Sequence, residues 1–66
     1  MKRTFIDIRD RDQNCKIIKT YKFKGDVSII VVSLKSFQVI ELENNNNTTT
    51  IELENNHAFS VRNWGN

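Results

Sequence analysis

The sequence of 66 residues contains no proline, two glycines, one cysteine and one histidine. A single cysteine cannot form a disulfide within the chain, and His or Cys pairs at the spacing of a metal site are missing. The sequence also lacks a phosphate-binding glycine loop. These absences argue against metal-dependent and nucleotide-dependent catalysis. We therefore expect a protein that is not an enzyme and that uses no metal or other cofactor.

Long hydrophobic runs are missing as well. The longest apolar-rich stretch, Val27 to Leu34, is interrupted by Ser33, whereas a helix that spans a bilayer needs about 20 apolar residues. The basic start Met1–Arg3 is not followed by the hydrophobic region of a secretory signal. We expect a soluble, cytoplasmic protein without membrane contact, in which residues 1–66 form one small domain.

Residues that favour β-strands dominate the chain. Val, Ile, Thr and the aromatic residues make up more than a third of the sequence, whereas Ala occurs once and Leu three times. The expected fold is all-β, either an antiparallel meander or a small open barrel. Alternation of apolar and polar positions predicts five or six short strands, at about residues 3–9, 15–24, 27–34, 37–43, 48–54 and 58–64.

The segment 27–36 is compatible with a strand or with a short helix that Asp26 would cap. Its Val and Ile residues favour the strand, because β-branched side chains lose rotamer freedom in a helix. Such a strand is apolar on both faces, and one small sheet cannot cover both. We therefore predict a homodimer or a higher closed oligomer. The expected self-association residues are Val27, Ile29 and Val31 on one face and Ile30, Val32 and Leu34 on the other.

A hairpin is the clearest local signal. The word Ile-Glu-Leu-Glu-Asn-Asn occurs twice, in two alternating runs separated by asparagines. We expect Asn46 and Asn47 to form the two-residue turn, because asparagine tolerates the left-handed backbone conformation that such turns require. This register would set Glu41 directly opposite Glu52, an arrangement that destabilises a hairpin unless solvent or a basic surface compensates.

Charge is divided unevenly along the chain. Residues 1–35 carry nine Lys or Arg against four Asp, and residues 36–66 carry one Arg against four Glu.

The leading hypothesis is a non-catalytic protein-interaction module, a small regulator or inhibitor that occupies a partner's surface. The abundance of Asn, Lys and Ile, whose codons are AT-rich, favours a phage or mobile-element origin. The expected partner-binding residues are Arg62 and Trp64, typical of interface hot spots, together with Glu41, Glu43, Glu52 and Glu54.

The alternative hypothesis is a β-barrel that binds single-stranded nucleic acid. Lysines that share one face of a strand can contact phosphates, and a neighbouring aromatic ring can stack on a base. The overall formal charge of +2 is low for such a protein. The nucleic-acid-binding residues would be Arg3, Phe5, Lys16, Lys22 and Lys24.

Overall fold

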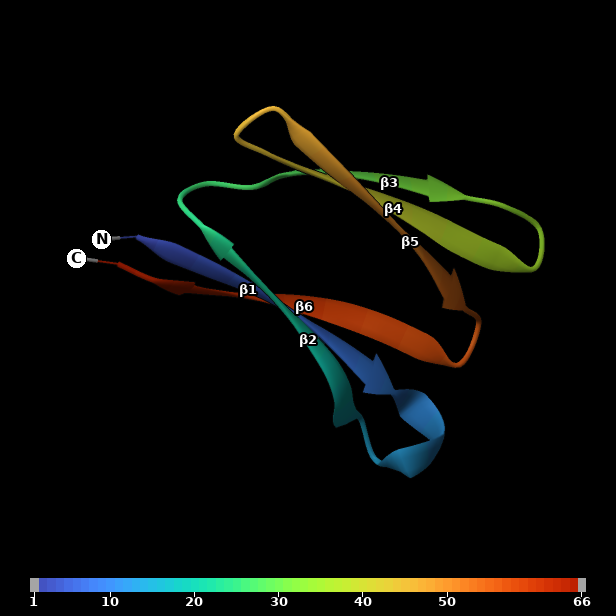
Figure 1. Cartoon of the computed structure of the whole chain (residues 1–66). Coiled ribbons are helices and arrows are strands. Elements are labelled where there is room, and N and C mark those ends of the chain that lie inside the picture. The colour runs from blue at the N-terminus through green and yellow to red at the C-terminus, as the bar shows by residue number, and fades with distance from the viewer. Residues whose placement is uncertain (1, 66) are drawn as a thin grey trace.

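The computed structural model describes residues 2–65, and almost all of them lie in β-strands (Figure 1). The all-β class expected from the sequence is confirmed. The only helical element among these residues is a single 3-10 turn, η1, between the first two strands. The elements are β1 (Arg3–Asp10), η1 (Arg11–Gln13), β2 (Lys16–Lys24), β3 (Ser28–Ser33), β4 (Phe37–Asn44), β5 (Asn47–Glu54) and β6 (His57–Trp64).

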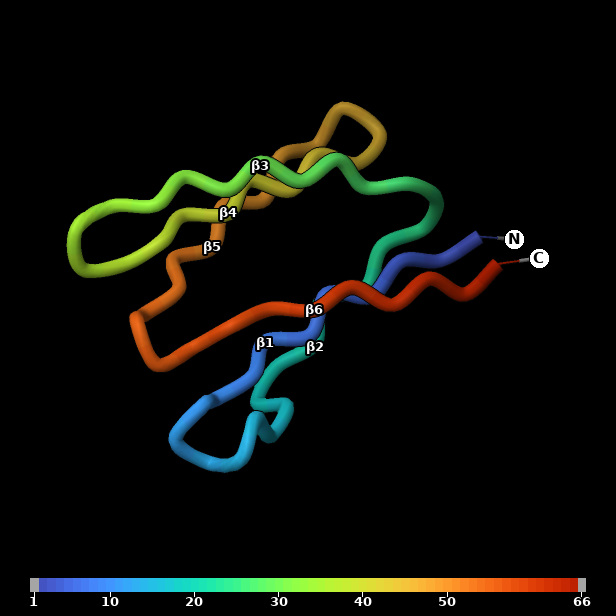
Figure 2. Tube along the Cα trace, turned by 180° about the vertical axis from the view of Figure 1, so that it is seen from behind, coloured from blue at the N-terminus to red at the C-terminus, as the bar shows by residue number. Residues whose placement is uncertain are grey.

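The strands form two antiparallel three-stranded sheets that pack as two layers (Figures 1 and 2). Sheet A has the order β2-β1-β6, and sheet B is the meander β3-β4-β5. The sheets do not close into a barrel, because β6 leaves the meander and returns to pair with β1. Each sheet therefore keeps two unpaired edges. No helix within residues 2–65 has the length and apolar character needed to cross a bilayer.

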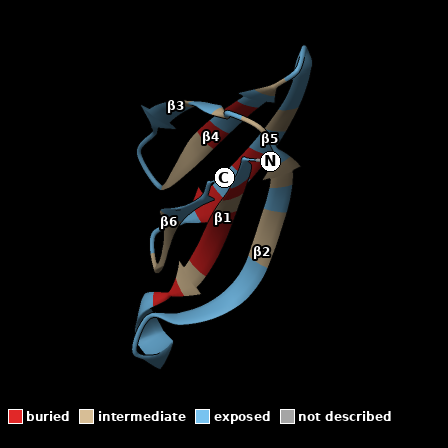
Figure 3. Cartoon of the chain, turned by 90° about the vertical axis from the view of Figure 1, so that its left-hand side faces the viewer, coloured by how far each residue is buried: buried red, intermediate tan, exposed pale blue. Residues whose placement is uncertain are grey.

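The core lies between the two layers and consists of aliphatic side chains. Strand β1 contributes Ile6 and Ile8, which are buried together with two residues each from β4 and β5. Full burial of one such side chain stabilises the fold by about 1.5–3 kcal/mol. Figure 3 shows that buried positions concentrate in β1 and recur in β4, whereas β2 and β3 contain only intermediate and exposed positions. The core residues are Ile6, Ile8, Ile40, Leu42, Ile51 and Leu53.

The ambiguous segment 27–36 forms strand β3 at the edge of sheet B, and no helix is present there. The strand interpretation of this segment is therefore correct. Val27 and Ile29 are half-buried and pack against the core. The remaining apolar residues of the segment stay exposed, namely Ile30, Val31, Val32 and Leu34.

The hairpin β4–β5 is present, but its register differs from the expected one. The turn is formed by Asn45 and Asn46, which have φ angles of 50° and 68°. The pairing moves by two residues, so that Glu41 lies opposite Thr50 and Glu52 lies opposite Val39. The prediction that the two glutamates face each other is wrong. A shift of two residues keeps every side chain on its expected face, because side chains alternate with a period of two.

The asparagine run allows this change of register. Several neighbouring Asn pairs can adopt the two left-handed residues of a tight turn, so the turn sequence alone does not choose among them. The observed register releases Asn44 from the turn. Its side-chain amide donates to the carbonyl oxygens of Lys24 at 2.7 Å and Asp26 at 2.9 Å. These bonds connect sheet B to the end of β2 and to the link between the sheets.

Candidate nucleic-acid interface

The outer face of sheet A brings together cationic and aromatic side chains. Strand β1 lies in the centre of this sheet, so each of its outward residues has one neighbour on β2 and one on β6. The ends of β1 and β6 near the two termini lie side by side (Figure 2). We call the surface at this end the basic-aromatic face, and it consists of two rows across the three strands, Lys24–Arg3–Trp64 and Lys22–Phe5–Arg62.

Most of this face is accessible. The side chain of Trp64 is 67% exposed, and Arg3, Lys22 and Lys24 are exposed as well. Phe5 is half-buried between its neighbours. A hollow of about 410 Å³ opens beside the aromatic ring, and it is lined by Arg3, Phe5, Lys22, Phe23 and Lys24.

The next row of the same face contains a buried carboxylate, Asp7. Arg62 holds it with two hydrogen bonds, from Nε to Oδ2 at 2.6 Å and from Nη2 to Oδ1 at 3.0 Å. The hydroxyl of Thr20 also donates to Oδ1 at 2.7 Å. The hydrogen bond from Arg62 lowers the pKa of Asp7 against the opposing effect of burial, and the Thr20 bond lowers it further. The same contact raises the pKa of Arg62. The contact with Arg62 therefore favours the charged form of Asp7, and Asp7 in turn fixes Arg62.

Arg62 in turn covers the aromatic ring of the face. Its guanidinium lies over the ring of Phe5, 5.0 Å from the centroid, in a cation–π contact. The charge of Arg62 is balanced by Asp7, so this residue orders the surface and adds little net positive charge. The free positive charge comes from Arg3, Lys22 and Lys24, none of which forms a salt bridge with another residue in the part of the chain that the structure describes.

The structure brings together four of the five residues of the nucleic-acid hypothesis. Lys16 is the exception. Lys19 lies opposite Ile8 and Ile17 lies opposite Arg9, so Ile18 is an extra residue that forms a β-bulge. The bulge reverses the alternation of β2, and Lys16 pairs with Asp10 on the inward side of the sheet. A strict period of two therefore gives the wrong face for Lys16.

The residues of the protein-interaction hypothesis lie on two separate surfaces. Arg62 and Trp64 belong to the basic-aromatic face of sheet A. The four glutamates are exposed on the other layer, where they point outward from β4 and β5. They are Glu41, Glu43, Glu52 and Glu54. No group of three or more His, Cys, Asp or Glu residues with the arrangement of a metal site occurs within residues 2–65.

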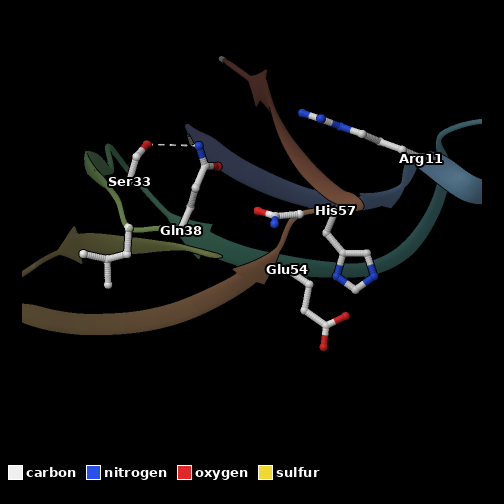
Figure 4. Close-up of a pocket in the computed structure, with 7 residues that line it drawn as sticks. Arg11, Ser33, Gln38, Glu54 and His57 are labelled. Carbon is white, nitrogen blue, oxygen red and sulfur yellow. Dashed lines mark hydrogen bonds between the residues drawn. The ribbon is translucent and has the colours of Figure 1, made fainter. Parts of the chain in front are cut away.

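A second, smaller hollow of about 140 Å³ lies where the start of β4 approaches the turn between β5 and β6 (Figure 4). Ser33, Glu54 and His57 are among its lining residues, which are the residue types of a hydrolase triad. Their arrangement does not support that chemistry. The Ser33 hydroxyl accepts a hydrogen bond from Gln38 at 3.2 Å, and no hydrogen bond joins it to His57 within the described chain (Figure 4).

Comparisons with protein-family models, with curated proteins and with solved structures give no match. Function is therefore argued from the surfaces of this molecule. The basic-aromatic face combines free positive charge, an exposed indole and a hollow within two adjacent rows of one sheet. From the sequence, Arg62 and Trp64 are grouped with the four glutamates and not with the lysines. Strands β1 and β6 are far apart in the chain, and no local pattern indicates that these two strands pair.

Proposed function

We propose that this protein binds single-stranded nucleic acid through the basic-aromatic face of sheet A. The observation that carries the proposal is the row Lys24–Arg3–Trp64, in which two free cations and an exposed indole lie side by side. Cations contact phosphates, and an exposed aromatic side chain stacks on a base. Both kinds of contact are available on one surface.

A single strand fits this surface better than a duplex does. Bases are available for stacking only where they are not paired, and an open sheet face presents its aromatic side chains to splayed bases. Reading the major groove of a duplex requires an element that projects from the protein, such as a helix or a two-stranded ribbon. The basic-aromatic face lies instead on one side of a three-stranded sheet, across β2, β1 and β6, and has no projecting element.

The charge of the face sets the expected salt dependence. Arg3, Lys22 and Lys24 are free to contact three phosphates. Each contact with a single strand contributes roughly −0.7 to the slope of log K against log salt concentration, so we expect a slope of about −2. The low overall charge of the chain does not prevent this, because the four glutamates lie on the opposite layer and Asp7 is paired with Arg62.

The test is a fluorescence-anisotropy titration with a labelled single-stranded oligonucleotide of about 12 nucleotides at several salt concentrations. The double variant Lys22→Gln/Lys24→Gln should reduce the slope from about −2 to about −0.7, because one phosphate contact remains. The matched control is Lys16→Gln/Lys19→Gln, which removes the same charge from the same strand but from its other side. The control should keep the slope of the unmodified protein.

Two results would overturn the proposal. The first is a failure to bind DNA or RNA oligonucleotides at about 50 mM salt, where phosphate contacts are strong. The second is an equal loss of affinity in the two double variants, because net charge and not the arrangement of the face would then govern binding. Duplex DNA of the same length serves as a competitor, and we expect it to compete weakly.

A protein partner is the second candidate, favoured by a mixed acidic and aliphatic surface on sheet B. Ile30 is 58% exposed and lies directly opposite Glu41. Such a surface suits a basic partner protein, and the chain would then act as a small cytoplasmic regulator or inhibitor, as expected for a phage or mobile-element protein. Capture from lysate by the unmodified protein, but not by a Glu41→Lys/Glu43→Lys variant, would support this role.

A further inference from the structure

Strand β3 differs from the other strands at the sheet edges. The two sheets have four edge strands, namely β2, β6, β3 and β5. Charged side chains, especially lysines, discourage an exposed edge from pairing with another chain. Strand β2 carries four lysines, β5 two glutamates and β6 an arginine. Strand β3 reads Ser-Ile-Ile-Val-Val-Ser and carries no charge. It is the unprotected edge of the molecule.

The hydrogen bonds of the hairpin β3–β4 show which backbone groups of β3 are free. The amide of Leu34 donates to the carbonyl of Phe37 at 2.8 Å, so this pair is hydrogen-bonded. In an antiparallel ladder such pairs alternate, which directs the N–H and C=O groups of Ile30 and Val32 toward β4. The backbone groups of the residues between them point away from the sheet. These residues are Ile29, Val31 and Ser33.

We propose that β3 is a homodimer interface, in which it pairs antiparallel with β3 of a second copy about a two-fold axis at Val31. In this register Val31 faces Val31, and Ile29 faces Ser33 of the other copy. The three residues of each β3 whose backbone N–H and C=O groups point away from β4 then form hydrogen-bonded pairs with the second copy. The two copies of sheet B join into one continuous six-stranded sheet.

The side chains around β3 match a second copy of the same strand. On the outer face, Ile30 lies opposite Val32 of the second copy, so two exposed aliphatic side chains cover each other twice. Strand β3 itself carries no charged residue, so antiparallel pairing of two copies brings no like charges together. Asp26, which precedes the strand, forms a salt bridge with Lys2 of its own chain at 2.6 Å.

Sedimentation equilibrium at tens of micromolar tests the dimer, in a Cys15→Ser background that removes the exposed thiol. We expect twice the monomer mass of 7.8 kDa. Val31→Pro should give a monomer, because proline removes an N–H that points away from β4 and is tolerated on an edge strand. The matched variant Val32→Pro removes an N–H that bonds to β4, and it should lower the stability of the monomer itself.

A second variant keeps the proposal testable if proline disturbs folding. Ile30→Lys/Val32→Lys places two lysines on the exposed outer face and should give a folded monomer, because each lysine would face a lysine of the second copy. Oxidation of Val31→Cys should give a disulfide-linked dimer in the proposed register, whereas Ile30→Cys should remain unlinked. An unmodified protein that sediments as a monomer, or a folded double-lysine variant that remains a dimer, would overturn the proposal. A monomeric result would leave the β3 edge to a different occupant.

Discussion

Asp7 shows how one buried residue can fix the side chains of a surface. Its carboxylate is fully buried, yet it lies on the outer face of sheet A, where Arg62 and Thr20 cover it. A buried carboxylate without partners would be costly, and here three hydrogen bonds compensate. The sequence gives no sign of this role, because Asp7 sits in an ordinary alternating strand and Arg62 is 55 residues away in the chain.

The lowered pKa of Asp7 predicts a specific acid sensitivity. In the unfolded chain Asp7 takes up a proton near pH 3.9, whereas in the folded chain it does so at lower pH. Its ion pair therefore stabilises the fold above about pH 4, and this contribution is lost as the pH falls through the folded value. Asp7→Asn should lower the free energy of unfolding at pH 7 by about 1.5–3 kcal/mol and flatten its decrease below pH 4.

Urea unfolding followed by circular dichroism between about pH 2.5 and pH 7 measures this effect. Arg62→Gln is the matched control, since it removes the partner and should flatten the same part of the profile. Some acid dependence should remain in both variants, because the pKa of Asp10 is also lowered, by hydrogen bonds from Gln13 and from the backbone of Asp12. Parallel pH profiles in the unmodified protein and in Asp7→Asn would contradict the assigned role of the pair.

At the scale of elements, the sequence pattern locates every strand within one residue of its observed bounds. This succeeds because alternation and β-branched residues are local signals. Two local details escape it. The bulge at Ile18 reverses one end of β2, and the asparagine run allows more than one turn. Both depend on how neighbouring strands pack, and the hydrophobic alternation of one strand contains no information about its neighbours.

Asn44 is the residue through which the observed hairpin register holds the two sheets together. Asn44→Asp keeps the size of the side chain but removes its two donated bonds to the carbonyls of Lys24 and Asp26. We expect a loss of about 1–3 kcal/mol in the free energy of unfolding, at roughly 0.5–1.5 kcal/mol for each bond. Asn47→Ala, at the opposite position of the same turn, should change stability by less than about 0.5 kcal/mol. Equal effects of the two substitutions in chemical denaturation would show that Asn44 does not connect the sheets.

At the scale of the whole molecule, the uneven charge of the sequence becomes a difference between two faces. The outer face of sheet A is cationic and aromatic, and that of sheet B carries the four glutamates. The division into two layers depends on the pairing of β1 with β6, the first and last strands of the chain. A sequence pattern cannot show such a distant pairing, so the composition of the basic-aromatic face could not be predicted completely.

The two-faced arrangement also bears on assembly. Contact between the cationic face of one copy and the acidic face of the next is a head-to-tail contact. Repeated contacts of this kind build an open chain of copies, unless the rotation between successive copies closes a ring. Pairing of β3 with β3 of a second copy is symmetric and closes after two copies. It also leaves the basic-aromatic face, which lies on the other sheet, outside the β3 interface. Nucleic-acid binding and dimerisation can therefore be measured independently.

Trp64 allows the most direct test of nucleic-acid binding, because it is the only tryptophan in the chain and belongs to the proposed interface. Unlabelled single-stranded DNA should quench its fluorescence in a saturable titration at about 50 mM salt, and added salt should restore the emission. In a parallel anisotropy titration, Trp64→Ala should weaken binding by about 1–3 kcal/mol, and Trp64→Phe should retain most of the affinity. Emission that stays unchanged while oligonucleotide is added at low salt would contradict the account.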